Sequence, residues 1–189
     1  MKTLTIIPSR MSATRLPGKP LLKINGLSII SHVFKKAEQA DIGEVFVATE
    51  DQEIVDDVTK NGGNAILTSK NHKTGTDRIY EAFQIINSKD VDIILNLQGD
   101  EPAINIKDII GLNKKMISTQ SKMGTLAAEI KNFKDLENSN IVKVITKKDL
   151  KEDQFSLAET FTRNTKNVEN IYHHIGIYCY SSETLKKFV

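Results

Sequence analysis

The chain has 189 residues, of which 39% are hydrophobic and 26% are charged, and its formal net charge is +2 at pH 7. This composition is typical of a soluble globular protein with a buried core. A net charge this small argues against nucleic-acid binding through a bulk electrostatic field, so any anion site must depend on local charge. The single cysteine excludes an internal disulfide and suits a reducing compartment. No apolar run approaches the roughly 18 residues of a membrane helix and no signal-peptide core opens the chain, so we expect a cytoplasmic protein with no membrane insertion.

Strand-like and helix-like segments alternate along the chain. A short apolar run, Leu4–Ile7, ends at Pro8, and apolar positions at helical spacing follow over 29–40. Residues Thr49–Gln52 match a capping box that starts a second helix, and Gly62-Gly63 stops it. The other expected strands are 45–49, 65–67, 91–97, 124–130, 141–146 and 175–180, and the other expected helices lie around 79–86, 106–117 and 182–189.

This order of segments predicts an α/β fold, a doubly wound and mostly parallel sheet with helices on both faces. No repeat or linker divides the chain, so we expect a single domain over 1–189. In such sheets ligands bind beyond the carboxyl ends of the strands. The segments expected there are the loop after Ile7, Thr74–Arg78 and Gln98–Pro102.

The loop Pro8–Pro20 is stiff and basic. It contains three of the four prolines of the chain, the cations Arg10, Arg15 and Lys19, and no acid. Prolines lower the entropy that a loop loses on ordering, and Gly18 permits close approach to a ligand. The combination suits a polyphosphate, which arginine grips in a fork and lysine attracts as a point charge. The alternative, a solvated loop with incidental charges, is less favoured because the loop follows the first strand.

The loop is not a Walker A motif. Ala13 stands where that motif has its first glycine, and Pro20 replaces the Ser or Thr that binds magnesium. No G-x-G-x-x-G dinucleotide fingerprint occurs in the chain either.

An acidic turn follows the most apolar expected strand. Gln98, Asp100 and Glu101 come directly after Leu97, and Asp100 is the better candidate for a magnesium ligand because Glu101 precedes a proline. Magnesium commonly takes one or two carboxylates and completes its shell with phosphates and water. The alternative is a Gly-Asp turn whose side chain bonds only its own backbone.

Six stretches occur in the order found in one enzyme family: IPSRMSATRLPGKPLLKINGLSIISHV, VFVATEDQEIVDDV, HKTGTDRIYEAF, LNLQGDEP, NIVKVI and HIGIYCYSSETLKKFV. The ordered set resembles the 3-deoxy-manno-octulosonate (Kdo) cytidylyltransferases, also called CMP-Kdo synthetases, which have a nucleotide-diphospho-sugar transferase-like fold. The resemblance implies that CMP passes from CTP to the anomeric hydroxyl of the acid sugar Kdo, releasing pyrophosphate and supplying CMP-Kdo for lipopolysaccharide synthesis. It also implies dependence on Mg²⁺ and a homodimer.

The resemblance further assigns roles to individual residues. Arg10, Arg15 and Lys19 would hold the triphosphate, Lys19 would lie near the developing charge, and Asp100 would bind Mg²⁺. The remaining roles are Gly75 beside the nucleotide, Arg78 facing an anionic group, Gln98 between the nucleotide and the sugar, and His174 and Tyr178 near the sugar. For Arg78 an alternative remains, an ion pair with Asp77 or Glu81 near the start of a helix.

Two departures from the family pattern leave alternatives open. The resemblance implies a longer chain with a second acidic metal ligand beyond Val189, so a nucleotide-binding form without activity is one alternative. Leu157 stands where the family usually has an arginine, and Arg163 is the candidate to replace it. An amino-substituted Kdo is therefore a second alternative. A sialic-acid-like acceptor is another, because nucleotidyltransferases for such acids resemble this chain in fold.

Overall fold

A computed structural model describes residues 1–12, 16–88, 90–132, 134–151, 155–165 and 169–189. The chain forms two units, one of Met1–Gly124 with Ile177–Val189 and one of Thr125–Gly176. The single domain over 1–189 stays a prediction. Among the described helices, none combines the length and the apolar character that crossing a bilayer requires.

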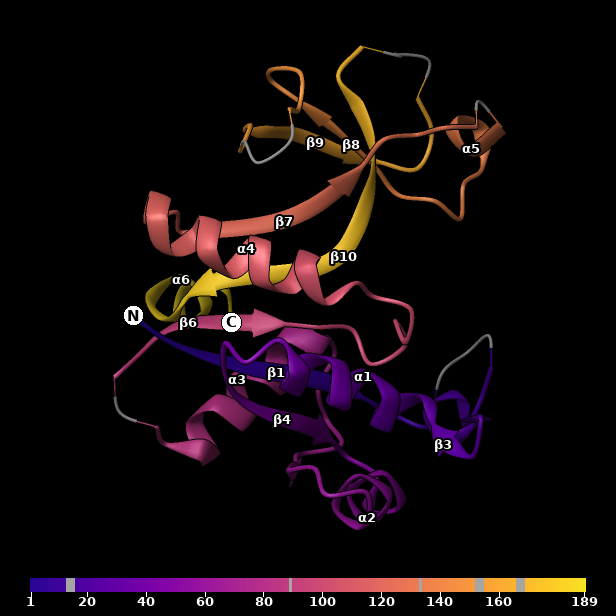
Figure 1. Cartoon of the computed structure of the whole chain (residues 1–189), viewed down its shortest axis with the longest axis vertical. Coiled ribbons are helices and arrows are strands. Elements are labelled where there is room, and N and C mark those ends of the chain that lie inside the picture. Colours follow the sequence, from indigo (N-terminus) through magenta and orange to yellow (C-terminus); the bar gives the residue numbers. More distant parts are fainter. Residues whose placement is uncertain (13–15, 89, 133, 152–154, 166–168) are drawn as a thin grey trace. The chain divides into compact units, whose positions relative to one another are not determined.

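The first unit is built around a parallel sheet. The strand β1 (Lys2–Ser9) lies between β4 (Gly43–Thr49) and β6 (Val91–Asn96), and both neighbours run parallel to it (Figure 1). Beyond β4, the sheet continues with the parallel strand β5 (Ala65–Leu67). On the other side, the end of β10 (Ile171–Ser181) pairs antiparallel with β6. The predicted mostly parallel sheet is confirmed.

Helices cover both faces of this sheet. On one face, the helices α3 (Gly75–Ile86) and α6 (Ser182–Phe188) contribute to an apolar cluster with β1, β4 and β6. On the other face, α1 (Ile29–Gln39) packs against β1 and α4 (Ile106–Thr119), and the Thr3 hydroxyl donates to Asn113 of α4 at 2.8 Å. Side chains of successive strand residues point to opposite faces, so neighbouring residues of β1 supply both cores. This is the predicted doubly wound arrangement.

The sequence predicts that Pro8 ends the first strand, and this is wrong. Strand β1 continues through Pro8, which lies in register with Ala48 of β4. The Ile6 carbonyl accepts from the backbone N–H of Leu97, so Pro8, two residues later, faces the same side. The ladder with β6 ends at Ile6, so no partner there requires the N–H that proline lacks.

The predicted capping box at Thr49–Gln52 is also wrong. The N-cap of α2 (Gln52–Lys60) is Asp51, and its side chain makes no capping hydrogen bond. The Thr49 hydroxyl instead accepts from the backbone N–H of Asp51 at 3.1 Å. The predicted stop is confirmed, since Gly62 has a φ of 84° and the N–H of Gly63 donates to the Val58 carbonyl at 2.9 Å.

Short elements connect β1 to α1. They are the 3₁₀ turn η1 (Lys19–Leu21) and the two-stranded hairpin of β2 (Lys23–Ile24) and β3 (Leu27–Ser28). The sequence predicted none of these, because they lie in the loop after the first strand and show no run of apolar residues at strand or helix spacing.

The second unit contains the strand predicted at 141–146 and a strand that was not predicted from the sequence. Strand β8 (Lys143–Thr146) pairs antiparallel with β9 (Ala158–Thr162) and with the start of β10. Strand β9 is mostly exposed and lacks alternating apolar residues, so only its backbone pairing identifies it. The other elements are β7 (Met123–Ala128), which enters this unit from the first, and α5 (Lys134–Glu137).

Cys179 offers a simple check of the core. Its side chain is fully buried in β10, as the sequence predicts, and burial raises the pKa of its thiol to about 12. Because the thiolate is the reactive form, we expect almost no alkylation by iodoacetamide at pH 8 in the native protein and complete alkylation in denaturant. Mass spectrometry of the intact chain measures both, and rapid labelling of the native protein would contradict this burial.

Candidate active site

The candidate site is a pocket at the carboxyl ends of the parallel strands of the first unit. The chain leaves β1 through α1 toward β4 on one side and later returns to β6 on the other. The two connections diverge at this edge and leave a crevice between them, which is where open α/β sheets bind ligands. The pocket has a volume of about 330 Å³ and is lined by Pro8, Ser9, Arg10, Lys19, Pro20, His72, Lys73, Thr74, Gly75, Arg78, Gln98, Gly99 and Asp100.

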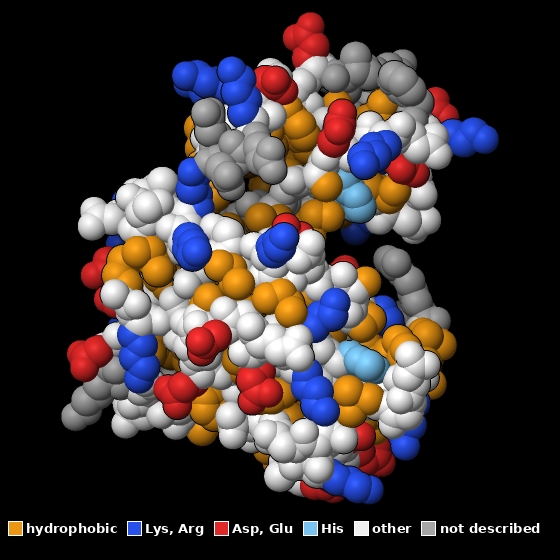
Figure 2. All heavy atoms as spheres, viewed as in Figure 1, with side chains coloured by type: hydrophobic (Ala, Val, Ile, Leu, Met, Phe, Trp, Pro, Cys, Tyr) orange, Lys and Arg blue, Asp and Glu red, His pale blue; other side chains and the backbone are white. Residues whose placement is uncertain are grey.

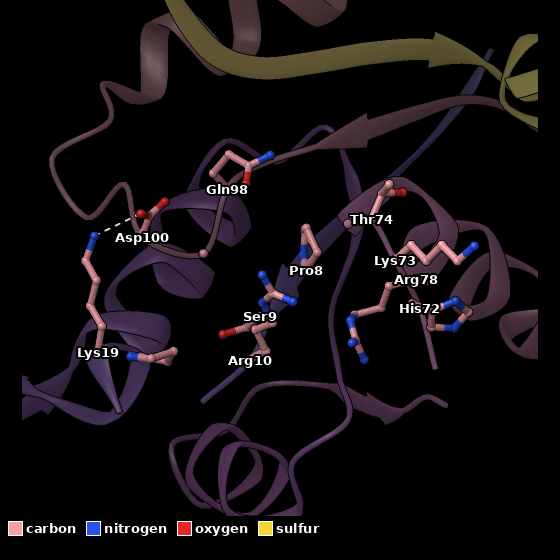
Figure 3. A pocket seen from close by; sticks show the side chains of 13 residues that line it. Pro8, Ser9, Arg10, Lys19, His72, Lys73, Thr74, Arg78, Gln98 and Asp100 are labelled. Carbon is pink, nitrogen blue, oxygen red and sulfur yellow. Dashed lines mark hydrogen bonds and ion pairs between the residues drawn. The ribbon is translucent and has the colours of Figure 1, made fainter. Parts of the chain in front are cut away.

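Three segments that are distant in sequence thus meet at one pocket, as the sequence analysis expects. Figure 3 shows Lys19 and Asp100 on one side, Arg78, His72 and Lys73 on the other, and the end of β1 between them. Arg15 lies outside the described residues. Over the face visible in Figure 2, basic and acidic side chains are interspersed.

Lys19 and Asp100 form an ion pair across one edge of the pocket. The Nζ of Lys19, in η1, lies 2.8 Å from an Asp100 oxygen in the turn after β6 (Figure 3). The two side chains are 33% and 56% exposed. Sequence analysis predicts both at one edge of the sheet but separated by a bound ligand. In this structure they touch, so a ligand of Asp100 must compete with Lys19.

Two cations at the pocket lie outside the ion pairs that the described residues form. Within the described part of the chain, neither Arg10 nor Lys73 forms an ion pair. Arg10 follows the last residue of β1, and Lys73 precedes the N-cap of α3. An anion in the pocket would therefore meet two positive charges.

Arg78 is held by the protein itself. Its guanidinium is almost fully buried, forms an ion pair with Glu50, and donates to the Thr68 hydroxyl at 2.6 Å and the Ser69 carbonyl at 3.3 Å. The sequence alternatives for its partner were Asp77 and Glu81, and the residue that pairs with it is neither. Arg78 ties α3 to the segments that follow β4 and β5, and it also contributes to the pocket wall.

The N-terminus of α3 opens into the pocket. The Thr74 hydroxyl accepts from the Asp77 N–H at 3.2 Å, and the Asp77 carboxylate accepts from the Thr74 N–H at 3.0 Å, forming a capping box. A side chain at Gly75 would meet only Pro8, at an ordinary contact distance of 3.6 Å. Internal packing therefore leaves free space at Gly75. Backbone N–H groups at a helix N-terminus favour bound anions.

His72 and Lys73 also line the pocket, although the sequence suggested no role for either residue. His72 donates through Nε2 to the carboxylate of Glu81, which also accepts from the Ser69 N–H at 2.9 Å. Burial opposes ionisation of Glu81, but hydrogen bonds from His72 and Ser69, with the charges of His72 and Arg78, outweigh it and lower the pKa of Glu81. Their position in the sequence could have indicated a place in the site, since both residues directly precede Thr74-Gly75.

The turn after β6 brings Gln98 to the pocket. Its amide donates to the Asn96 side-chain oxygen at 3.4 Å. Gly99 is needed for packing, because a Cβ there would lie 2.9 Å from the Pro8 carbonyl oxygen and 3.0 Å from a methyl of Ile30. This close contact is the reason for glycine at this position, where the sequence suggested only a turn.

Tyr178 and His174, which the resemblance places near the sugar, are not among the described residues that line this pocket. Tyr178 is in β10 opposite Asn96 of β6 and is stacked on Tyr180. Burial raises the pKa of its hydroxyl. His174 belongs to the second unit, where its ring meets Phe161 edge-on and burial, with the charge of His173, lowers its pKa.

Leu157 and Arg163 also belong to the second unit. Leu157 is 70% exposed. The guanidinium of Arg163 donates to the Ser139 carbonyl at 2.9 Å, so it already has a backbone partner within its own unit.

Comparisons with known proteins agree on one kind of enzyme. A family model described as cytidylyltransferase matches residues 4–189. A 3-deoxy-manno-octulosonate cytidylyltransferase of Rhodopseudomonas palustris is 43% identical over 100% of this chain and 77% of its own length, and that of Nitrobacter hamburgensis is 41% identical over 100% and 73%. A solved CMP:2-keto-3-deoxy-manno-octonic acid synthetase complexed with CTP superposes with a TM-score of 0.87 and 34% identity, over 100% of this chain and 77% of that one.

Proposed function

The chain belongs to the cytidylyltransferase family, and we propose that it transfers CMP from CTP to the anomeric hydroxyl of Kdo. The observation that carries the proposal is a basic pocket at the switch point of the sheet, in a chain similar over its whole length to enzymes of that name. In the reaction the hydroxyl oxygen bonds to the α-phosphorus and the bond to the bridging oxygen breaks. Pyrophosphate leaves, and the hydroxyl proton passes to solvent.

Positioning and charge neutralisation are the main demands of such a transfer. Arg10, Lys73 and the N-terminus of α3 would bind the triphosphate, because they carry positive charge or free N–H groups. Lys19 would stabilise the negative charge that develops on the leaving pyrophosphate. Gln98 would orient the acceptor through its amide, and Gly75 leaves room for the nucleotide.

Asp100 is suited to hold Mg²⁺. Its carboxylate is a hard oxygen ligand, it is half exposed at the pocket edge, and it is the only carboxylate among the described lining residues. Among the described residues no three acidic, histidine or cysteine side chains gather into a metal site, so phosphate oxygens and water would complete the shell. When bound, the ion would supply positive charge that offsets the negative charge of the phosphates. A homodimer stays a prediction from the family resemblance, and a cytoplasmic location stays a prediction from the sequence.

The proposal is tested by pyrophosphate release from the purified protein. We expect release only when CTP, Mg²⁺ and Kdo are all present, and no release with ATP, GTP or UTP. The same assay with amino-substituted Kdo and with a nine-carbon sialic acid tests the alternative acceptors. The amino-substituted Kdo is included because the exposed Leu157 stands where the family usually has an arginine. Turnover with another acceptor alone would overturn the substrate, and CTP binding without product would favour a non-catalytic form.

Lys19→Ala should raise the KM for CTP and lower kcat by about a hundredfold, since it removes a donor aimed at developing charge. The substitution also frees Asp100, so the Mg²⁺ concentration for half-maximal activity should fall. Steady-state kinetics measure all three quantities. Lys23→Ala, which removes an exposed lysine of β2 outside the pocket, is the matched control. Kinetics of the Lys19 variant equal to those of this control would remove Lys19 from the site.

A further inference from the structure

The N-cap residue of α2 does not cap its own helix. Asp51 has the extended backbone of an N-cap, with φ −107° and ψ 117°, yet its carboxylate accepts no hydrogen bond from the first turn. Aspartate is among the residues that usually make this bond. The carboxylate instead accepts from the backbone N–H of Met11 at 2.7 Å, 40 positions away in sequence.

Met11 is the junction at which both ends of the basic loop meet. Its N–H is bound by Asp51, and its carbonyl accepts from the N–H of Gly18 at 3.0 Å. Gly18 has a φ of 73°, a left-handed conformation that favours glycine, and it is the N-cap of η1. Arg10 immediately precedes Met11, and Lys19 immediately follows Gly18. One carboxylate thus anchors the backbone from which two pocket cations extend.

We propose that Asp51 is a positioning residue for the triphosphate of CTP, and this inference depends on the function proposed above. Asp51 is not among the described residues that line the candidate site, so it acts through Met11 rather than on the ligand. By fixing Met11, it holds Arg10 and Lys19 at the spacing that the phosphates require. A charge-assisted hydrogen bond to a backbone N–H is strong enough for this task.

If Asp51 acted only through its charge, replacing it would change the affinity for CTP in the opposite direction. Removing a negative charge near a cationic pocket raises the local positive potential and should tighten binding of CTP. If the anchor dominates, removing the same charge should weaken binding. The nearby acids do not replace it, because Glu50 is paired with Arg78 and Glu53 is exposed on α2.

Three substitutions distinguish the effect of the hydrogen bond to Met11 from the effects of capping α2 and of negative charge. Asp51→Ser supplies a hydroxyl that can cap α2 but is too short to reach Met11. Asp51→Asn keeps an oxygen acceptor for Met11 without the charge. Asp56→Ser is the matched control, because Asp56 is an exposed acid of the same helix that bonds only Gln52 among the described residues.

Calorimetric titration of CTP and thermal unfolding of the full chain are the two measurements. We expect Asp51→Ser to raise the Kd for CTP about tenfold, the loss of one charge-assisted hydrogen bond, while its unfolding temperature stays the same or rises. Asp51→Asn should bind CTP within about threefold of the wild type, and Asp56→Ser should match the wild type. If Asp51→Ser does not fold, Asp51→Ala, which leaves α2 as uncapped as it is now, takes its place.

The outcomes distinguish this inference from the proposed function. Unchanged or tighter binding of CTP by a folded Asp51→Ser or Asp51→Ala variant would overturn the role of Asp51. An equal loss of affinity in Asp56→Ser would overturn it too, since the loss would then not depend on the hydrogen bond to Met11. A wild-type protein that binds no CTP would instead refute the proposed function itself.

Discussion

Asp100→Ala should abolish magnesium-dependent turnover, with a fall of about a thousandfold or more, while the protein folds normally. The large effect is expected because no other carboxylate among the described residues lines the pocket. Normal folding is expected because the side chain is 56% exposed and its ion pair with Lys19 lies at the surface, where such pairs contribute little to stability.

The same variant should separate nucleotide binding from metal binding. Without Mg²⁺, Asp100→Ala should bind CTP as tightly as the wild type or more tightly, because Lys19 loses its competing partner. Adding Mg²⁺ should then increase the affinity of the wild type but not that of the variant. Titration calorimetry with and without the ion measures this difference, and Asp56→Ala controls for loss of a surface acid. If the variant retained magnesium-dependent turnover, Asp100 would not be the metal ligand and the metal site would lie elsewhere in the protein.

Arg78→Met should lower the free energy of unfolding by about 3–5 kcal/mol, because it leaves the carboxylate of Glu50 buried and unpaired. The side chains of Arg78 and Glu50 are only 4% and 15% exposed. The substitution also removes donors from the Thr68 hydroxyl and the Ser69 carbonyl, which position the segment before α3. Urea unfolding followed by circular dichroism measures the loss.

A second substitution tests the cause of this instability. Combining Arg78→Met with Glu50→Gln should restore part of the lost stability, because the buried charge is removed together with its partner. Arg163→Met, at an exposed arginine that donates to backbone carbonyls, should cost at most about 1 kcal/mol and serves as the control. A variant as stable as the wild type but unable to bind CTP would show that Arg78 instead acts directly on the nucleotide.

Several parts of the site were predictable because they depend on neighbouring residues in the chain. The segments containing Lys19 and Asp100 were expected at the same edge because each follows a run that reads as a parallel strand. The periodicity of α1 and α3 was visible for the same reason, since apolar residues recur every three or four positions.

The errors and omissions arise where a distant segment decides a local feature. Thr49–Gln52 reads as a capping box, but the N-cap is Asp51, and its carboxylate accepts from the distant Met11 N–H instead. Pro8 reads as a strand end, but β6 has already separated from β1 at that position. Strand β9 has no apolar alternation, because its place depends on backbone pairing with β8.

The sequence by itself determined the α/β class, the order of most of the larger elements, the basic loop and the acidic turn, since these follow from local spacing and charge. Only the tertiary structure decided which residues interact across the fold. Arg78 pairs with Glu50, Asp51 with Met11, and His72 with Glu81. The first two pairs are 28 and 40 positions apart in sequence. Which of many carboxylates meets a given donor depends on how strand ends are brought together, and no local pattern carries that information.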